Sequence, residues 1–239
     1  LAKLREVGYE PAALLGVVGT AAMVFAAYHR GEAALPVAMV LVVIFSMLWF
    51  LAGAGGGQAT LNIGVTVFGV GWIGLCGAYA AVLLGVQGGA GVGDAGKGIL
   101  FGAILSTVAY DIGGYFVGRS VGSSQLSAAS PNKTIEGLLG GCIAALTVAL
   151  IYNELVSLPD GPPPDPLTGP LGDGLALGLT VAVMAPLGDL CQSMIKRDLG
   201  VKDMGSVLPG HGGLTDRFDA LLFVLPAVYY IAKLSDFFV

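Results

Sequence analysis

Charged residues are scarce in this chain. Asp, Glu, Lys and Arg make up 11% of its 239 residues, which is roughly half of the usual share in a soluble domain. Hydrophobic residues reach 55%, and the mean hydropathy is +0.83. A chain of this length has too little interior to bury so much apolar surface, which argues against a soluble globular protein. The composition therefore predicts an integral membrane protein.

Cysteines are also few. Cys76, Cys142 and Cys191 stand in apolar stretches, and no pair has the spacing of a metal or redox motif, so we interpret them as small core residues. The net charge of −5 does not indicate a nucleic-acid partner, and we expect none. The chain begins at Leu1 without a basic-then-apolar signal sequence. We therefore expect a piece of a longer protein, with further membrane helices ahead of it.

Long apolar runs, in contrast, are abundant. A helix needs about 20 apolar residues to cross a bilayer, and these runs are apolar on all sides instead of alternating as in a membrane β-barrel. Their many small residues would let helices pack closely. The expected fold is an all-α, polytopic transmembrane helical bundle. On the length criterion it has about seven spans, near residues 12–28, 34–53, 61–85, 98–118, 136–154, 173–195 and 217–237.

Basic residues gather in two loops of the second half, residues 117–135 and 196–217. The positive-inside rule places both loops in the cytoplasm. Between the two helices that separate these loops lies LPDGPPPDPLTGP, residues 158–170, which has no Lys or Arg. Its prolines oppose a helix, so we expect an exposed connector there.

Two carboxylates, Asp111 and Asp189, lie inside predicted spans. Ionisable groups are costly in a membrane, so each is a candidate functional residue. On a helix, Asp189 shares one face with Ser193 and Lys196, and Asp111 shares one face with Arg119. Each face therefore runs from a buried carboxylate to a cation at the membrane surface.

A second pair of carboxylates, Asp216 and Asp219, stands at the start of the last predicted span. Carboxylates supply the hard oxygen ligands that Mg²⁺ prefers, while Arg and Lys hold phosphate oxygens. Simpler interpretations exist, because a single intramembrane Asp beside a basic residue is often a structural ion pair, and PGHGG around His211 can be an ordinary turn. The mixture of both signs at one membrane depth favours a metal together with phosphates.

The whole string SMIKRDLGVKDMGSVLPGHGGLTDRFD, residues 193–219, resembles the signature of the CDP-diacylglycerol synthases, also called phosphatidate cytidylyltransferases. A second block, residues 110–137, resembles the other cytoplasmic segment of that family, and the resemblance covers about the second half of the chain. Asn132, Ile135 and Gly114 depart from residues common in the family. The matching positions of the first block are Ser193, Ile195, Lys196, Arg197, Lys202, Asp203, Gly205, Leu208, Pro209, His211, Gly212, Gly213, Leu214, Asp216, Arg217, Phe218 and Asp219.

The resemblance implies that CTP and phosphatidic acid react to CDP-diacylglycerol and pyrophosphate, with Mg²⁺ as cofactor and a second cation as an option. It implies that Asp189, Asp216 and Asp219 are catalytic metal ligands and that Lys196 is catalytic. Residues expected to bind the substrates are Asp111, Arg119, Lys133, Ser193, Arg197, Lys202, His211, Gly212, Gly213 and Arg217. We rank His211 below the carboxylates, because a phosphatidate oxygen is already ionised near neutral pH and needs no general base.

The predicted spans, the positive-inside rule and the resemblance together imply an organisation of the chain. Residues 1–97 would hold N-terminal transmembrane helices, and residues 98–239 a catalytic transmembrane region whose active site faces the cytoplasm. The expected setting is a homodimer among the lipids of a bacterial cytoplasmic membrane.

Two other functions stay open at this point. One is a related CTP-dependent transferase or polyprenol-type kinase that acts on a different lipid. The other is an ion-coupled transporter in which Asp111 and Asp189 bind a cation at mid-membrane. The clustering of carboxylates with phosphate-type cations, and the lack of an evident inverted repeat, argue against the transporter.

Overall fold

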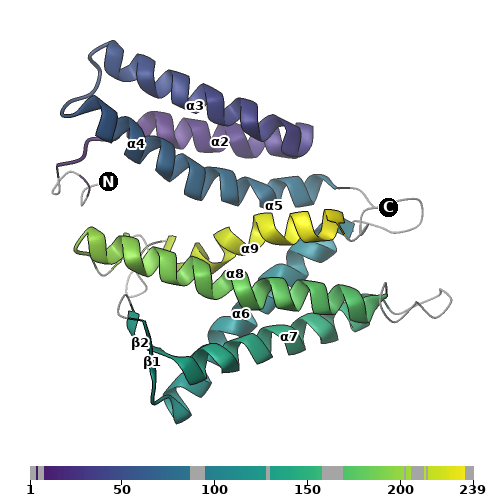
Figure 1. Ribbon diagram of the computed structural model, residues 1–239. Helices are drawn as coiled ribbons and strands as arrows, with labels where there is room; N and C mark the ends of the chain where they lie inside the picture. The colour runs from purple at the N-terminus through teal and green to yellow at the C-terminus, as the bar shows by residue number, and fades with distance from the viewer. Residues whose placement is uncertain are drawn as a thin grey trace. The chain divides into compact units, whose positions relative to one another are not determined.

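The computed structural model describes residues 4, 8–86, 95–127, 130–157, 169–201, 203–205, 213 and 215–234, with the backbone alone at 131–132, 156–157 and 170. The chain forms two compact units. The first comprises Leu1–Val86 with Asp198–Lys202, and the second comprises Gln87–Arg197 with Asp203–Val239. Both units are built mainly of helices (Figure 1).

The first unit is a bundle of apolar helices. In chain order they are α2 (Ala13–Arg30), α3 (Ala34–Leu51), α4 (Ala59–Gly69), a π-helical segment (Val70–Leu75) and α5 (Cys76–Gly85). Helix α2 packs against both α3 and α5 (Figure 1). The chain reverses between α2 and α3 at Gly31, whose φ of 67° is a conformation that glycine adopts without strain.

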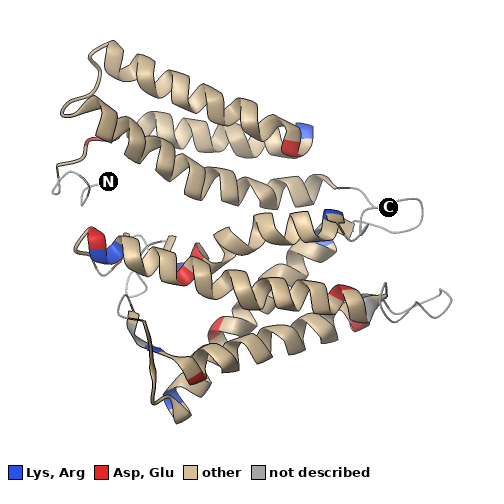
Figure 2. Cartoon of the chain, in the orientation of Figure 1, with Lys and Arg blue, Asp and Glu red and all other residues tan. Residues whose placement is uncertain are grey.

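The outward faces of α2 and α3 are strongly apolar. Leu14, Phe25, Val37, Phe45 and Leu51 are each more than half exposed, and Figure 2 shows few charged residues along these helices. Water would disfavour an apolar surface of this extent, whereas lipid tails accept it. The surface agrees with the membrane protein that the composition predicts.

The second unit contains most of the two polar segments identified in the sequence, residues 117–135 and 196–217. Its elements are α6 (Ala95–Val121), β1 (Gln125–Ser127), β2 (Ser130–Thr134), α7 (Ile135–Ser157), α8 (Pro170–Asp198) and α9 (Thr215–Leu234). The strands pair antiparallel, with Gln125 opposite Thr134 and Ser127 opposite Ser130. This hairpin joins α6 to α7, which pack along each other (Figure 1).

Glycines bring the helices of the second unit into close contact. A Cβ at Gly113 would lie 3.0 Å from the carbonyl oxygen of Gly140, which places α6 directly on α7. A Cβ at Gly178 would lie 2.9 Å from the Cα of Leu146, and this places α8 on α7. A Cβ at Gly188 would meet the backbone of α9. Small residues therefore mediate helix packing here, as expected where lipid provides no hydrophobic driving force.

A proline within α8 explains a hydrogen bond between α7 and α8. Pro186 has no N–H, so the carbonyl of Ala182, four residues earlier, lacks its helical donor. The thiol of Cys142 on α7 donates to this carbonyl at 3.4 Å. The sequence suggested only a small core residue at position 142. The structure shows in addition that its thiol takes the place of the helical donor that is missing at Pro186.

We expect Cys142→Ala to lower the free energy of unfolding by about 1 kcal/mol, the usual net worth of one hydrogen bond. Cys142→Ser keeps a donor and is expected to remain close to the unchanged protein. Thermal unfolding of the detergent-solubilised variants measures the difference. Equal unfolding temperatures for the two variants would contradict this role of the thiol.

Five helical segments among the described residues are long and apolar enough to cross a membrane: Ala13–Leu51, Ala59–Gly85, Ala95–Val121, Ile135–Leu155 and Leu171–Asp198. The all-α membrane bundle is thus supported as a class, while the expected number of seven spans is not confirmed. The spans expected near 12–28 and 34–53 fall within one of these segments. Helix α9 is not among the five, because charged residues stand at both of its ends.

The polar segments also differ in detail from the expectation of simple loops. Within residues 117–135, α6 continues to Val121 and the β-hairpin follows. Within residues 196–217, α8 continues to Asp198 and α9 begins at Thr215. Residues 158–168 of the expected connector lie outside the described part of the chain, and α8 begins at Pro170, a position where the missing N–H of proline is harmless.

Candidate active site

A cavity of about 390 Å³ lies in the second unit, between α6, the β-hairpin, α7 and α8. Its charged lining consists of Asp111 and Arg119 from α6, Lys133 from β2 and Asp189 from α8. The volume falls within the usual range for small-molecule sites, about 300–1,000 Å³. Four residues that the sequence analysis assigned to substrate or metal are therefore brought together from three separate elements.

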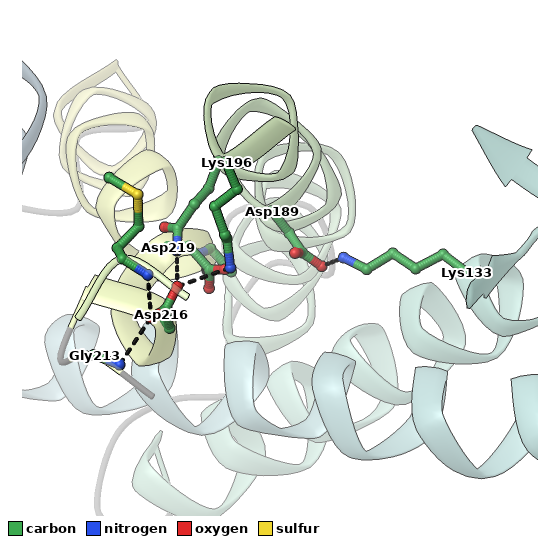
Figure 3. Close-up of polar contacts among 9 residues, drawn as sticks. Lys133, Asp189, Lys196, Gly213, Asp216 and Asp219 are labelled. Carbon is green, nitrogen blue, oxygen red and sulfur yellow. Dashed lines mark hydrogen bonds and ion pairs between the residues drawn. The ribbon is translucent and has the colours of Figure 1, made fainter. Parts of the chain in front are cut away.

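An ion pair crosses this cavity. Lys133 reaches from β2 to the carboxylate of Asp189 on α8 (Figure 3). The Lys133 ammonium is buried, and no hydrogen bond to it is recorded beyond this ion pair among the described residues. Burial lowers the pKa of the Lys133 amine, although the nearby carboxylates of Asp219 and Asp111 oppose the shift.

A tyrosine and an arginine form another part of the cavity lining. An Nη1–H of Arg119 donates to the hydroxyl of Tyr115 at 2.6 Å, and the guanidinium carbon lies 5.9 Å from the centre of the Tyr115 ring. The two residues are one helical turn apart on α6, as the predicted polar face of this helix requires. Both side chains are exposed, so the guanidinium can reorient toward a ligand at low cost.

Asp216, in the first turn of α9, is the most heavily bonded carboxylate of the site. Its Oδ1 accepts from the Lys196 ammonium and from Gln192 Nε2, both at 2.8 Å. Its Oδ2 accepts from the backbone N–H groups of Gly213, at 2.8 Å, and Met204, at 2.9 Å (Figure 3). Burial alone would raise the pKa of Asp216, but these donors outweigh it, so the pKa lies below the usual value.

Gln192 is a residue that the sequence analysis missed. It is fully buried in α8, and its Nε2 is one of the two donors to Asp216 Oδ1. The signal was available in principle, because Gln192 stands one helical turn before Lys196 and therefore shares its face. A neutral amide inside an apolar helix is a weaker sequence signal than the charged residues nearby.

The carboxylates of α6 and α9 act on one another as well. Asp111 is within electrostatic range of Asp219, Lys133 and Arg217. Asp219 accepts the N–H of Ala220 at 2.9 Å, and it lies within range of Lys196 and Lys133. The Asp219 carboxylate therefore interacts with one lysine from each of the two ion pairs, Lys133 and Lys196.

Other predicted site residues are placed less centrally. Ser193 is half-buried on α8, while Arg197 and Arg217 are exposed at the ends of α8 and α9, and none of the three lines the cavity. Gly213 contributes a backbone N–H to Asp216. Lys202, His211 and Gly212 lie outside the described residues, and their assignments stay predictions.

Glu136, in the first turn of α7, ties the hairpin to the ends of two helices. Its carboxylate accepts from the Ser123 hydroxyl at 2.7 Å and from the backbone N–H groups of Ser123 and Ser124, at 3.2 and 3.3 Å. The N–H of Ile135 donates to the Ser124 carbonyl at 2.9 Å. The end of α6 is thereby held against the start of α7, and the strand that carries Lys133 is held between them. Glu136 lies in the second motif block, residues 110–137, but the sequence alone did not indicate this role.

The carboxylates of the site are suitable ligands for a hard divalent cation, although in this structure they bind lysines. Among the described residues, no group of three or more His, Cys, Asp or Glu side chains is arranged to hold a metal ion. Asp189 and Asp216 instead hold the ammonium groups of Lys133 and Lys196. Carboxylate oxygens are the ligands that Mg²⁺ prefers, and Asp189 and Asp216 each already bind one positively charged group.

These features define a class, that of a helical membrane protein with a polar cavity in which carboxylates meet ammonium and guanidinium groups. Within that class, the chain belongs to the cytidylyltransferase family, whose sequence model matches residues 2–235. The resemblance based on residues 193–219 is thereby confirmed.

Curated relatives include several phosphatidate cytidylyltransferases. That of Bacillus subtilis is 42% identical over 136 residues, which cover 56% of this chain and 47% of the relative. That of Synechocystis sp. is 43% identical over 126 residues, covering 53% and 40%. That of Mycobacterium bovis is 31% identical over 233 residues, covering 92% and 71%. The matched part of this chain thus spans less than half the length of the first two relatives.

Proposed function

We propose that the protein transfers the cytidylyl group of CTP to phosphatidic acid and forms CDP-diacylglycerol and pyrophosphate. The observation that carries this proposal is the cavity in which two carboxylates and two cations from α6, β2 and α8 meet inside a membrane bundle. Membership of the cytidylyltransferase family and the names of the relatives support it. Phosphates need cations, and a lipid substrate needs a site that it can reach from the bilayer; a cationic cavity among membrane helices meets both needs.

In the proposed reaction, a phosphate oxygen of phosphatidic acid attacks the α-phosphorus of CTP. The bond from that phosphorus to the bridging oxygen breaks, and pyrophosphate leaves with the bridging oxygen. The attacking oxygen is already ionised near neutral pH, since the second pKa of a phosphate ester is about 6. The protein therefore has to supply positioning and charge neutralisation instead of a general base.

The cations of the site suit this task. Lys133 has a buried ammonium with donor capacity beyond Asp189, and Arg119 lines the same cavity. Lys196 lies beside Asp216 at the junction of α8 and α9. We assign these three residues to the phosphate oxygens of the nucleotide and the lipid.

Asp189, Asp216 and Asp219 would hold Mg²⁺, and a second cation is compatible with the same set. When bound, Mg²⁺ neutralises charge on the phosphates and on the leaving pyrophosphate. All four acceptor directions of Asp216 are filled by Lys196, Gln192, Gly213 and Met204. Lys196 is the partner that can turn to a phosphate, so its position is the one that a metal would take.

The setting of the site is part of the proposal. Bacterial relatives and the basic residues near the ends of α6 and α8 support an active site on the cytoplasmic face of a bacterial membrane. The family resemblance supports a homodimer surrounded by membrane lipids. CTP would enter from the cytoplasm and the lipid from the bilayer.

The deciding experiment incubates the purified protein in detergent with labelled CTP, Mg²⁺ and phosphatidic acid. We expect CDP-diacylglycerol and pyrophosphate in equal amounts. Parallel reactions with diacylglycerol or a polyprenyl phosphate in place of phosphatidic acid test the related lipid transferases. If CTP and phosphatidic acid yield no CDP-diacylglycerol, the proposed function is wrong, whatever the other two lipids yield.

Glu136→Gln tests the role of the hairpin in this function. The variant replaces one acceptor oxygen by an amide group that faces N–H donors, so the strand carrying Lys133 should lose its fixed position. We expect the KM for CTP to rise several-fold while kcat changes less, because the cations contribute mainly to binding. Glu154→Gln, on the exposed far end of the same helix, is the matched control. Identical KM values for the two variants would contradict the positioning role.

A further inference from the structure

The site contains two ion pairs of the same kind. Lys133 on β2 pairs with Asp189 on α8, and Lys196 on α8 pairs with Asp216 on α9 (Figure 3). In each pair, the proposed function gives the carboxylate to a metal ion and the ammonium to a phosphate. Without ligands, the two partners therefore neutralise each other. The ammonium then lies where the metal ion would bind, and the carboxylate lies where the phosphate would bind.

Separating the Lys133–Asp189 pair is costly unless each partner gains a new one. The Lys133 ammonium is buried, and a charge that loses its partner inside a protein is strongly destabilising. The pair opens at low cost only if both partners gain new ones together, phosphate oxygens for the ammonium and a cation for the carboxylate.

The second pair is less free to exchange. Asp216 is fixed by Gln192 and by the N–H groups of Gly213 and Met204 as well as by Lys196. Asp189 has Lys133 as its one recorded ionic partner among the described residues. Asp189 also lines the cavity, whereas Asp216 does not. The exchange is therefore centred on Lys133 and Asp189.

We propose that Lys133 is an exchangeable counter-ion of Asp189, so that a divalent cation and a nucleotide phosphate bind interdependently. The phosphate draws the ammonium from the carboxylate, and the divalent cation takes the place that the ammonium leaves. By linkage, the factor by which the phosphate raises metal affinity equals the factor by which the metal raises phosphate affinity. The empty protein thus binds either ligand alone weakly. This inference rests on the proposed function of the site.

The test measures Mn²⁺ binding by electron paramagnetic resonance, without nucleotide and therefore without any metal bound to CTP in solution. Lys133→Met frees Asp189, and we expect this variant to bind Mn²⁺ at least about tenfold more tightly than the unchanged protein. Lys133→Gln is the second variant, and size-exclusion chromatography with thermal unfolding shows which of the two is folded. Asp189→Asn should remove the gain when it is combined with either variant.

Two controls separate counter-ion exchange from a general effect of charge. Arg119→Met removes one positive charge from the same cavity, but Arg119 contacts Tyr115 and is recorded in no ion pair with Asp189. Lys97→Met removes one positive charge at the other end of α6. We expect both to change Mn²⁺ affinity by less than about threefold, because a charge outside the Lys133–Asp189 ion pair acts on that carboxylate only through a screened field. If Lys133→Met binds Mn²⁺ no more tightly than Arg119→Met, the proposal is overturned.

The outcome is independent of the test of function. A protein that forms CDP-diacylglycerol, yet shows no gain of Mn²⁺ affinity in the folded Lys133 variants, keeps its proposed function and loses the exchange. A protein that forms no CDP-lipid, yet shows the gain, keeps the exchange as a property of the cavity and loses the proposed function.

Discussion

Asp216→Asn is expected to lower turnover at least about a hundredfold, which corresponds to roughly 2.7 kcal/mol in the activation barrier. The substitution keeps the shape of the side chain but removes its charge, and it turns one acceptor oxygen into an amide donor. That donor would face either Lys196 and Gln192 or the N–H groups of Gly213 and Met204. Lys196 would also lose its carboxylate in a largely buried position, since its side chain is 18% exposed.

The same contacts mean that Asp216→Asn should not leave folding intact. Breaking a buried ion pair by removing one partner costs about 3–5 kcal/mol, so the unfolding temperature should fall together with the activity. Asp189→Asn removes a carboxylate with fewer bonds and is expected to lose turnover with less loss of stability. The comparison of these two variants separates the loss of metal and substrate binding from the loss of the hydrogen bonds that Asp216 accepts from Gly213 and Met204.

Turnover and thermal unfolding in detergent measure both effects. Asp173→Asn is the matched control, because Asp173 stands in the first turn of α8, at the opposite end of that helix from Asp189 and Lys196. We expect it to retain the activity of the unchanged protein. If Asp216→Asn and Asp189→Asn each keep more than about a tenth of the activity, a difference under 1.4 kcal/mol, the proposed metal ligation is wrong.

The class of fold followed from the sequence because it depends on composition. Long runs without charges can be stable only in lipid, and the helices α6, α7 and α8 coincide closely with the runs near 98–118, 136–154 and 173–195. The hairpin between α6 and α7 did not follow. Its two strands are short and polar, and they lack the alternation that marks a half-buried strand.

The members of the site were predictable, but their partners were not. Asp189, Lys196 and Asp216 stand out by charge within apolar surroundings, and helical spacing placed Asp189 and Lys196 on one face. Which ammonium meets which carboxylate depends on the packing of α6, α7, α8 and the hairpin. The pairing of Lys133 with Asp189 joins residues 56 positions apart in the sequence, a separation about which local periodicity says nothing.

The contact between α6 and α7 leads to the second large prediction. A Cβ at Gly137 would lie 2.9 Å from the carbonyl oxygen of Gly114, 3.1 Å from the Cα of Gly118 and 3.0 Å from the hydroxyl of Thr134. The first two are backbone atoms, which cannot turn aside as a side chain can. The Thr134 hydroxyl also accepts the Gly137 N–H at 3.1 Å and so caps the start of α7. Even one methyl group must therefore push α7 away from α6.

Gly137→Ala is expected to lower the free energy of unfolding by about 1–3 kcal/mol, as overpacking in a tight interface does, and to lower turnover because Gly137 also lines the cavity. Gly98→Ala is the matched control on α6: its Cβ would meet only the Tyr152 hydroxyl, at an ordinary contact distance of 3.8 Å. In an interior helical position this control gains helix propensity, so its unfolding temperature should be unchanged or raised. Thermal unfolding of the two variants, with turnover measured in parallel, tests the interface. If both substitutions have the same effect, glycine at position 137 is not required for the approach of α6 and α7, and the shape of the cavity does not depend on that approach.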